Sequence, residues 1–389
     1  MLNSRRFLPL LVLVATPAWA QENEQPDLRA SLSLERHVTA NALESSFPLT
    51  DWYTALRGSI ERTLALENGK ITLGAAMEAK RFDTYEMEDD RGVTLSASAE
   101  QRVGNRLELR GSIGWMLSSE GDDLALQDTI IGIRTVTETF LATAQAGIDL
   151  GKGFALVIDA GVMRETPRPT RFEADIAEPQ RLTPRKDRLE LAAKLGRTAG
   201  SWTLAGTAGS EFVAAGRQGH APYRFSLSRH KAVAEAKWTS ETGIGIGGAI
   251  GAEYLTAVGG ALSDLRPTYA LALELPVRSG IALRASLAAG FDTRNTDDPV
   301  ASWLERREIE ASLPLGEKLT FGVGLYSSWR EYLSLGGGEK AHGAYSELSY
   351  ALAKPVTVTF RVDASTARFI GTDTEIPRLD AYLGLRANM

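Results

Sequence analysis

The chain contains no cysteine, so neither a disulfide framework nor a cysteine-ligated metal site is possible. After Ala20 no run of about eighteen continuous apolar residues occurs, and we therefore expect no transmembrane helix. Histidine is also scarce. The four histidines are His37, His220, His230 and His342, and no metal-ligand cluster appears around them. We expect neither a metal nor a cofactor.

Basic residues are fewer than acidic ones, 43 against 49, which gives a formal net charge of −6. A nucleic-acid partner would require a basic face, so we expect none. The mean hydropathy of −0.14 is low for a helical membrane protein. A membrane barrel presents only alternate residues to lipid, so this value is compatible with one.

The first twenty residues have the pattern of a secretory signal. Arg5 and Arg6 form a positive start, Phe7–Val14 is a short apolar core, and Ala18-Trp19-Ala20 is a typical cleavage site. We expect residues 1–20 to be removed after export. The mature domain is then residues 21–389.

The segment Val356–Asp363 has a strict period of two. One face carries Val356, Val358, Phe360 and Val362, and the other carries Thr357, Thr359, Arg361 and Asp363. The same alternation recurs along the whole exported chain. It predicts the wall of a membrane barrel, with lipid outside and water inside.

Eight tight turns alternate with nine longer loops, which predicts an all-β fold with about eighteen strands in a single antiparallel transmembrane barrel. Sixteen or twenty strands are alternatives, because Glu120–Thr139 is either one long loop or an extra strand pair. Short turns belong to the periplasmic side and long loops to the extracellular side. An even count brings both ends of the chain to the same side.

This pattern over residues 21–389 resembles the bacterial outer-membrane β-barrel proteins, and porin-like channels in particular. Their last strand usually ends in an aromatic residue, whereas this chain keeps the alternation from Leu379 but ends in Met389. The resemblance implies the outer membrane of a Gram-negative bacterium, contact with outer-membrane lipid and lipopolysaccharide, and assembly by the barrel-assembly machinery.

The polar face of the alternation supplies candidate pore-lining residues of both signs. They are Arg57, Glu61, Lys80, Arg110, Arg284, Tyr326, Arg330, Tyr345, Glu347, Arg361, Asp363 and Tyr382. The three tyrosines are predicted at similar heights, where they would either stack on a passing sugar or pack the wall. Outward aromatic residues predict the interface girdle: Trp52, Trp115, Trp202, Trp238, Phe291 and Trp329.

The segment Thr166–Asp187 is rich in proline and basic residues. It carries Arg168, Arg171, Arg181 and Arg185. Three interpretations stay open for it: a constriction folded into the barrel, a surface that reaches anionic lipopolysaccharide, or a solvated loop.

An enzyme is not expected. His37 and His220 are predicted in loops, and His342 and Ser346 would be ~13 Å apart along a strand, although a cross-strand partner could complete a site. The pattern instead favours a porin-like channel for diffusion of small hydrophilic solutes. The alternatives are an export barrel for a polysaccharide, and a non-conducting surface-binding barrel or outer-membrane lipid hydrolase. The oligomeric state is left open.

Overall fold

The computed structural model describes residues 28–43, 48–126, 129–172, 179, 182–216, 225–257, 260–276, 280–294, 300–371 and 374–389. The predicted signal, residues 1–20, lies outside these ranges. The elements are β1 (Leu28–Thr39), β2 (Asp51–Leu66), β3 (Gly69–Phe82), the helical turn η1 (Glu86–Glu88), β4 (Asp90–Val103), β5 (Leu107–Leu126), β6 (Thr129–Gly151), β7 (Phe154–Pro167), β8 (Arg171–Phe172), β9 (Arg185–Ala199), β10 (Trp202–Gly216), β11 (Phe225–Thr239), β12 (Gly245–Ala257), β13 (Leu262–Pro276), β14 (Ala282–Asp292), β15 (Ser302–Pro314), β16 (Leu319–Tyr332), β17 (Gly338–Ala353), β18 (Val356–Ile370) and β19 (Glu375–Asn388).

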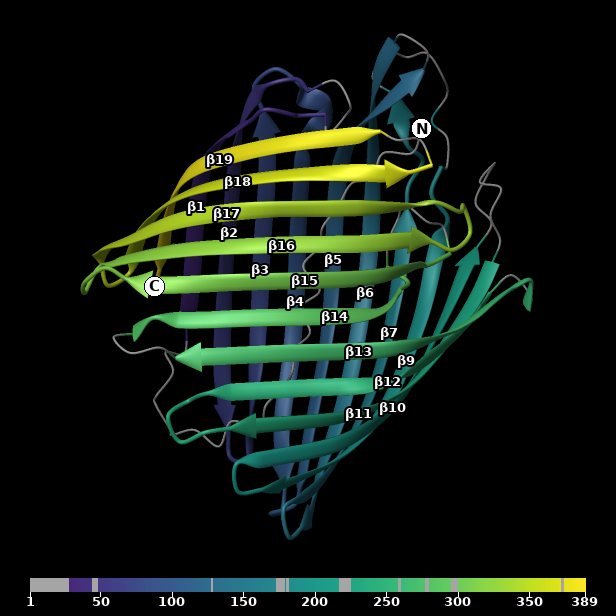
Figure 1. Cartoon of the computed structure of the whole chain (residues 1–389), viewed down its shortest axis with the longest axis vertical. Helices are drawn as coiled ribbons and strands as arrows, with labels where there is room; N and C mark the ends of the chain where they lie inside the picture. Colours follow the sequence, from purple (N-terminus) through teal and green to yellow (C-terminus); the bar gives the residue numbers. More distant parts are fainter. Residues whose placement is uncertain are drawn as a thin grey trace.

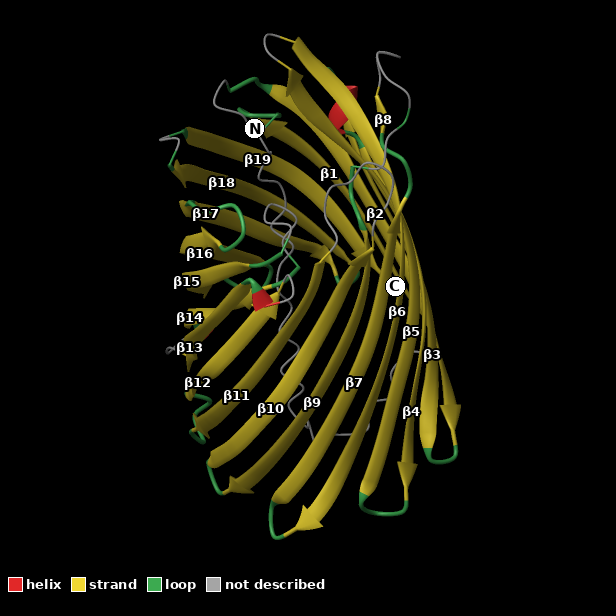
Figure 2. Cartoon of the chain, turned by 90° about the vertical axis from the view of Figure 1, so that its right-hand side faces the viewer, coloured by secondary structure: helices red, strands yellow, loops and turns green. Residues whose placement is uncertain are grey.

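The strands form one closed antiparallel barrel of 18 strands (Figures 1 and 2). Closure comes from β1, which pairs with β2 on one edge and with β19 on the other, from Ser31↔Asn388 to Thr39↔Asp380. The short strand β8 is additional, since it pairs only with β6. The predicted all-β fold and the count of about eighteen are confirmed.

Every second connection between strands is a short turn, as predicted, and the described ones, such as those after β2, β4 and β6, lie together at one end of the barrel (Figure 2). The turn after β6 illustrates their chemistry, because Gly151 and Gly153 adopt φ values of 81° and 80° that glycine tolerates best. Glu120–Thr139 is neither a long loop nor an extra strand pair. It forms the extended arms of the β5–β6 hairpin, paired as far as Leu126↔Thr129.

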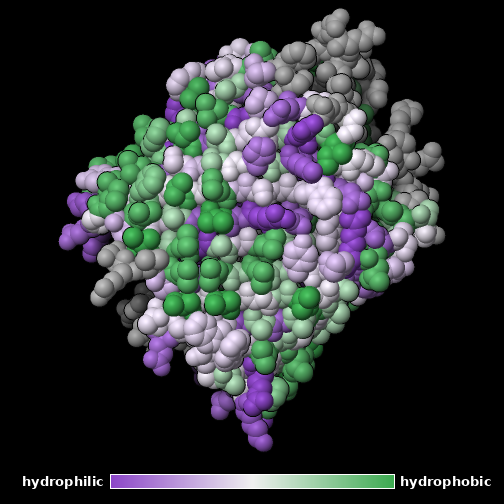
Figure 3. Space-filling view, in the orientation of Figure 1, coloured by the Kyte–Doolittle hydropathy of each residue, from purple (hydrophilic) through white to green (hydrophobic). Residues whose placement is uncertain are grey.

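Apolar side chains cover the outside of the barrel wall, as the alternation predicted. Leu379, Leu383 and Leu385 on β19 and Phe360 on β18 are all exposed. Figure 3 shows many apolar residues over the outer face of the wall, with hydrophilic residues at its edges and also in its middle. Among the described residues, no helix has the length and apolar character to cross a membrane.

The wall bends where β14 and β15 approach the end of the barrel opposite the tight turns. Pairing of β13 with β14 stops at Tyr269↔Ala289, whereas β14 and β15 stay paired to Asp292↔Ser302. Phe291 and Trp303 then pack edge to face, 5.1 Å apart, within an apolar cluster. The cluster includes the inner-face side chains Val213, Ala215, Phe225, Leu227, Leu255 and Ala257.

The girdle prediction was therefore wrong for Phe291, which is only 4% exposed. In the alternation of β14, Phe291 is on the outward side, but the strand has left the wall at this point. The outward side of β14 consequently faces the inner surface of β10–β12 instead of the outside of the barrel. We call the described residues at this bend, from Phe291 to Arg294 and from Val300 to Trp303, the inward segment.

Candidate channel constriction

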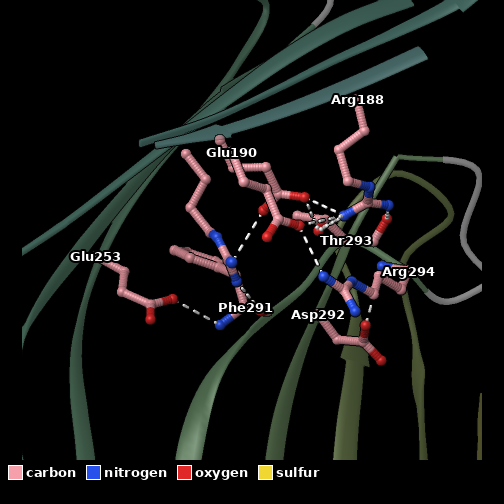
Figure 4. Close-up of polar contacts among 9 residues, drawn as sticks. Arg188, Glu190, Glu253, Phe291, Asp292, Thr293 and Arg294 are labelled. Atoms are coloured by element: carbon pink, nitrogen blue, oxygen red, sulfur yellow. Dashed lines mark hydrogen bonds and ion pairs between the residues drawn. The ribbon is translucent and has the colours of Figure 1, made fainter. Parts of the chain in front are cut away.

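Arg188 fixes the inward segment to the opposite strand β9. Its guanidinium donates hydrogen bonds to Thr293 Oγ1 at 2.9 Å and to the Thr293 carbonyl at 3.1 Å (Figure 4). It also forms an ion pair with Glu211 on β10. The Arg188 and Glu211 side chains are 4% and 3% exposed, so this pair is almost fully removed from water.

Further contacts extend this attachment along the inner wall. Arg229 on β11 pairs with Glu211 at 2.9 Å and donates to the Phe291 carbonyl at 2.6 Å. The Phe291 amide in turn donates to Glu253 Oε2 at 2.9 Å. Four strands, β9 to β12, therefore hold the end of β14 through charged groups (Figure 4).

Arg294 adds an ion pair to Glu190 on β9, at 2.7 Å. Burial alone would lower the pKa of Arg294, but the hydrogen bond that its guanidinium donates to Glu190 and the negative charges of Glu190, Glu211 and Asp292 raise it overall. The guanidinium thus stays charged. We define the latch as Arg188, Glu190, Glu211, Arg229, Thr293 and Arg294.

Open space remains along the inner wall beside the latch. A cavity of about 490 Å³ is lined by Lys70, Glu100, Arg110, Glu190, Glu211 and Arg229, among others. A second cavity of about 530 Å³ is lined by Arg57, Glu78, Glu347 and Tyr382 with their neighbours. The inward segment narrows the interior on the β9–β12 side, and polar walls remain elsewhere.

The charged residues chosen from the sequence lie on the inner face, and most form ion pairs there. The contacts are Arg57 with Glu35 (2.7 Å), Arg110 with Glu100 (3.7 Å), Arg284 with Glu310 (3.1 Å), Arg330 with Asp292 (3.5 Å), and Arg361 with Glu347 (3.5 Å) and Asp363 (3.2 Å). Lys80 lies over the Tyr53 ring at 4.7 Å, and Glu61 is exposed. Arg330 contacts the base of the inward segment.

The three tyrosines are held by the wall. The Tyr345 hydroxyl donates to Glu310 at 3.0 Å, and the Arg361 guanidinium covers its ring at 4.0 Å. The Tyr326 hydroxyl donates to Asp363 at 3.1 Å. Tyr382 lies against His37, with ring centres 4.6 Å apart.

Glycines on the neighbouring strand accommodate two of these rings. Tyr345 is paired with Gly324 and Tyr326 with Gly343, and a Cβ at either glycine would overlap the facing ring. Each ring therefore lies flat on the wall. This geometry favours the packing interpretation over the sugar-stacking one for Tyr326 and Tyr345.

Residues 166–168, 171–172 and 185–187 of Thr166–Asp187 are paired with strands of the wall. The Arg168 amide donates to the Val136 carbonyl of β6, and Arg171 is paired with Arg134 of the same strand. Arg185 begins β9 and bonds to Asp187. Arg181 lies outside the described residues.

The latch could not be predicted from the sequence. Arg188, Glu190 and Glu211 share the inner-face alternation with many other charged residues, so nothing distinguished them. The bend of β14 leaves no mark in its alternation, because the pattern continues unbroken to Asp292. The register of β14 against β13 and β15 was required to find it.

The histidines give a mixed outcome. The loop prediction for His37 was wrong, since it lies in β1, stacked on Tyr53 at 4.2 Å. Its Nδ1 is 2.9 Å from Asp380 and its Nε2 is 3.1 Å from Glu35. His220 lies outside the described residues.

His230 has a cross-strand partner. Its Nδ1 is 2.9 Å from Ser210 Oγ on the outer face of the barrel. In the described part of the chain, no third side chain is hydrogen-bonded to His230 and no cluster of His, Asp and Glu has the form of a metal site. A serine and histidine pair is present, but the orienting group of a hydrolase triad is not seen there.

Comparison with known proteins identifies the class of fold. No family model matches the sequence, and no curated protein matches it. Among solved structures, the chain is similar to the ferric citrate transporter FecA in its unliganded form (TM-score 0.53, 13% identity, covering 88% of this chain and 60% of FecA). It is also similar to the copper transporter OprC, with a TM-score of 0.54 and 11% identity, over 93% of this chain and 81% of OprC. A third similar structure is the FrpB iron transporter from Neisseria meningitidis, with a TM-score of 0.54 and 10% identity, over 89% of this chain and 64% of FrpB.

The fold is thus that of the outer-membrane β-barrel proteins, as the sequence resemblance implied. The chain spans about three fifths of the length of FecA. The identities of 10–13% establish the shared barrel fold and nothing finer.

Proposed function

We propose that the protein is an outer-membrane channel through which small hydrophilic solutes diffuse, with the latched inward segment as its constriction. The observation that carries this proposal is the attachment of the end of β14 to β9–β12 by charged side chains, next to an open cavity whose lining includes charged residues of both signs. Charges of both signs around a narrowed path create a transverse field that favours polar solutes. Such a path would select solutes by size and charge, without chemistry on them.

The proposal includes the cellular context. We place the barrel in the outer membrane of a Gram-negative bacterium, delivered by a signal cleaved after Ala20 and assembled by the barrel-assembly machinery. N-terminal sequencing of the protein purified from outer membranes tests this point. Gln21 as the first residue is expected, and a chain that retains residues 1–20 would contradict it.

The decisive experiment is single-channel conductance of refolded residues 21–389 in a planar bilayer, with ion selectivity taken from reversal potentials. Glu190→Lys adds positive charge beside the cavity and should shift selectivity toward anions. The matched control is Glu241→Lys, which makes the same change in an exposed periplasmic turn. We expect open steps for all three proteins and a selectivity shift for Glu190→Lys alone.

Two outcomes would count against the proposal. The absence of channel openings from a protein that migrates as a folded barrel in unheated gels would indicate a non-conducting scaffold. Equal shifts for Glu190→Lys and Glu241→Lys would show that the latch does not lie on the ion path.

A further inference from the structure

Three arginines gather on the outer face of the barrel at its extracellular end. Arg36 on β1 and Arg81 on β3 both pair with Thr54 on β2, so these residues form one line across three strands. Arg91 on β4 pairs with Ala79, two residues below Arg81, which makes it a diagonal neighbour within reach of a long side chain. We call Arg36, Thr54, Arg81 and Arg91 the outer basic cluster.

The cluster lies at the upper edge of the apolar band. Two residues below it on the same strands are Leu34 and Val93, both exposed, and the exposed Met77 on β3 is paired with Val93. Trp52 lies alongside, with the Arg36 guanidinium 5.4 Å from its ring centre. Exposed tryptophans mark the interface between hydrocarbon and headgroups in barrels of this kind. The arginines are therefore at the level of the outer-leaflet headgroups.

Positive charge in the cluster exceeds its counter-charge. Arg36 forms a bidentate pair with Asp83, with Nη1 to Oδ1 at 3.0 Å, and Nη1 also donates to Thr54 Oγ1 at 2.9 Å. Among the described residues, Arg81 and Arg91 have no carboxylate oxygen within ion-pair distance. Neighbouring like charges on a sheet are destabilising unless an anion lies between them.

We propose that the outer basic cluster binds a phosphate group on a lipopolysaccharide of the outer leaflet. Guanidinium groups bind phosphate through paired, charge-assisted hydrogen bonds, and the Thr54 hydroxyl is placed to donate a further one. A lipid-borne phosphate fits better than a free one, because Leu34, Met77 and Val93 directly below offer contacts for acyl chains. The inference rests on the proposed outer-membrane location but not on channel activity.

The test is a titration of purified lipopolysaccharide into the refolded protein in maltoside micelles, followed by the intrinsic fluorescence of Trp52 and the other tryptophans. The double variant Arg81→Ala/Arg91→Ala should bind at least tenfold more weakly than the wild type. The matched control is Arg62→Ala/Arg197→Ala, which removes two exposed arginines from the outer face near the periplasmic end. It should bind within twofold of the wild type.

Two further ligands distinguish the sources of phosphate. Dephosphorylated lipopolysaccharide should bind at least tenfold more weakly, and inorganic phosphate at the same concentration should not compete. Equal binding by both double variants, or no binding by the wild type, would overturn the inference, and effective competition by inorganic phosphate would overturn its lipid source. Conductance measurements on the same proteins separate the two proposals. If the wild type binds lipopolysaccharide but does not conduct, and Arg81→Ala/Arg91→Ala weakens that binding, only the proposed channel function is refuted.

Discussion

Arg188 and Thr293 are 105 residues apart in the chain, yet the Arg188 guanidinium donates to Thr293 Oγ1 across the barrel interior at 2.9 Å. The contact joins β9 to the end of β14, which are not neighbours in the sheet. A barrel wall alone does not bring these strands together. The bend of β14 brings β9 and the end of β14 together. The energetic cost of this bend is offset by the buried ion pairs and by the apolar cluster around Phe291.

Removing Glu211 should destabilise the barrel strongly. Glu211→Ala leaves Arg188 and Arg229 without their shared carboxylate, and an uncompensated buried charge costs about 3–5 kcal/mol of unfolding free energy. Glu235→Ala on β11 is the control, because its pair with Lys194 is partly exposed and contributes ~0–1 kcal/mol. Urea unfolding in lipid vesicles measures both. Similar losses for the two variants would mean that the latch carries no buried charge.

Arg294→Ala should enlarge the channel without unfolding it. The side chain holds the far side of the inward segment through one partly exposed pair with Glu190, so its loss frees the segment while the Arg188 contacts stay. Single-channel conductance should rise. Arg307→Ala removes an arginine whose partner Glu305 is on the same strand, and its conductance should match the wild type. An unchanged conductance for Arg294→Ala would contradict a role for the latch in the path.

Gly324→Ala tests the packing of the tyrosines. The added methyl group overlaps the Tyr345 ring, and overpacking of this kind costs about 1–3 kcal/mol. Gly322→Ala, two residues earlier on β16, meets Glu347 atoms only at 3.8 Å and should be nearly neutral. Thermal unfolding followed by gel mobility compares the two. If they were equally stable, Tyr345 would not lie on Gly324.

His37→Ala should weaken the closure of the barrel. The largely buried Asp380 would lose its contact with Nδ1 and keep only the Tyr53 hydroxyl, whereas the partly buried Glu35 would keep Arg57, so we expect a loss of about 1–3 kcal/mol of unfolding free energy. His342→Ala changes an exposed histidine on the outer face of β17 and should have little effect. Urea unfolding of both variants is the measurement, and a His37→Ala protein as stable as the wild type would be the contrary result.

Ser210→Ala/His230→Leu should not destabilise the protein. The hydrogen-bonded pair lies on the outer face, and replacing both partners by apolar groups is nearly neutral or stabilising where the surroundings are hydrocarbon. Unfolding free energy in lipid vesicles is the readout. A loss of several kcal/mol of unfolding free energy would show that the pair has a partner in the membrane. Ester hydrolysis is measured on the same two proteins, and its loss in the variant would support the hydrolase alternative.

The strand order and turns were predictable because a barrel wall imposes a period of two, and Val356–Asp363 expresses it without interruption. The extended arms of the β5–β6 hairpin could not be predicted, because the alternation of side chains continues past the apolar band and does not mark where that band ends. Phe291 was misplaced for a related reason. Its alternation is outward, and only contacts with distant strands, such as those of Leu227 and Leu255, decide which surface it faces.

The candidate site was less predictable than the fold. Alternation identified Arg361, Glu347 and Asp363 as inner-face residues, but their pairing depends on register. The fit of Tyr345 on Gly324 likewise depends on which residues stand opposite each other. His37 was assigned to a loop because the end of β1 could not be located from a single strand.

The seam between β1 and β19 has a consequence for the order of folding. Ser31 meets Asn388 there, so almost the entire chain must be made and delivered before the sheet has no free edge. Contacts with such long sequence separation form slowly, because the intervening chain must first be ordered. Until β19 arrives, the backbone amides and carbonyls on one edge of β1 are open to pairing with any strand, including one from another nascent copy.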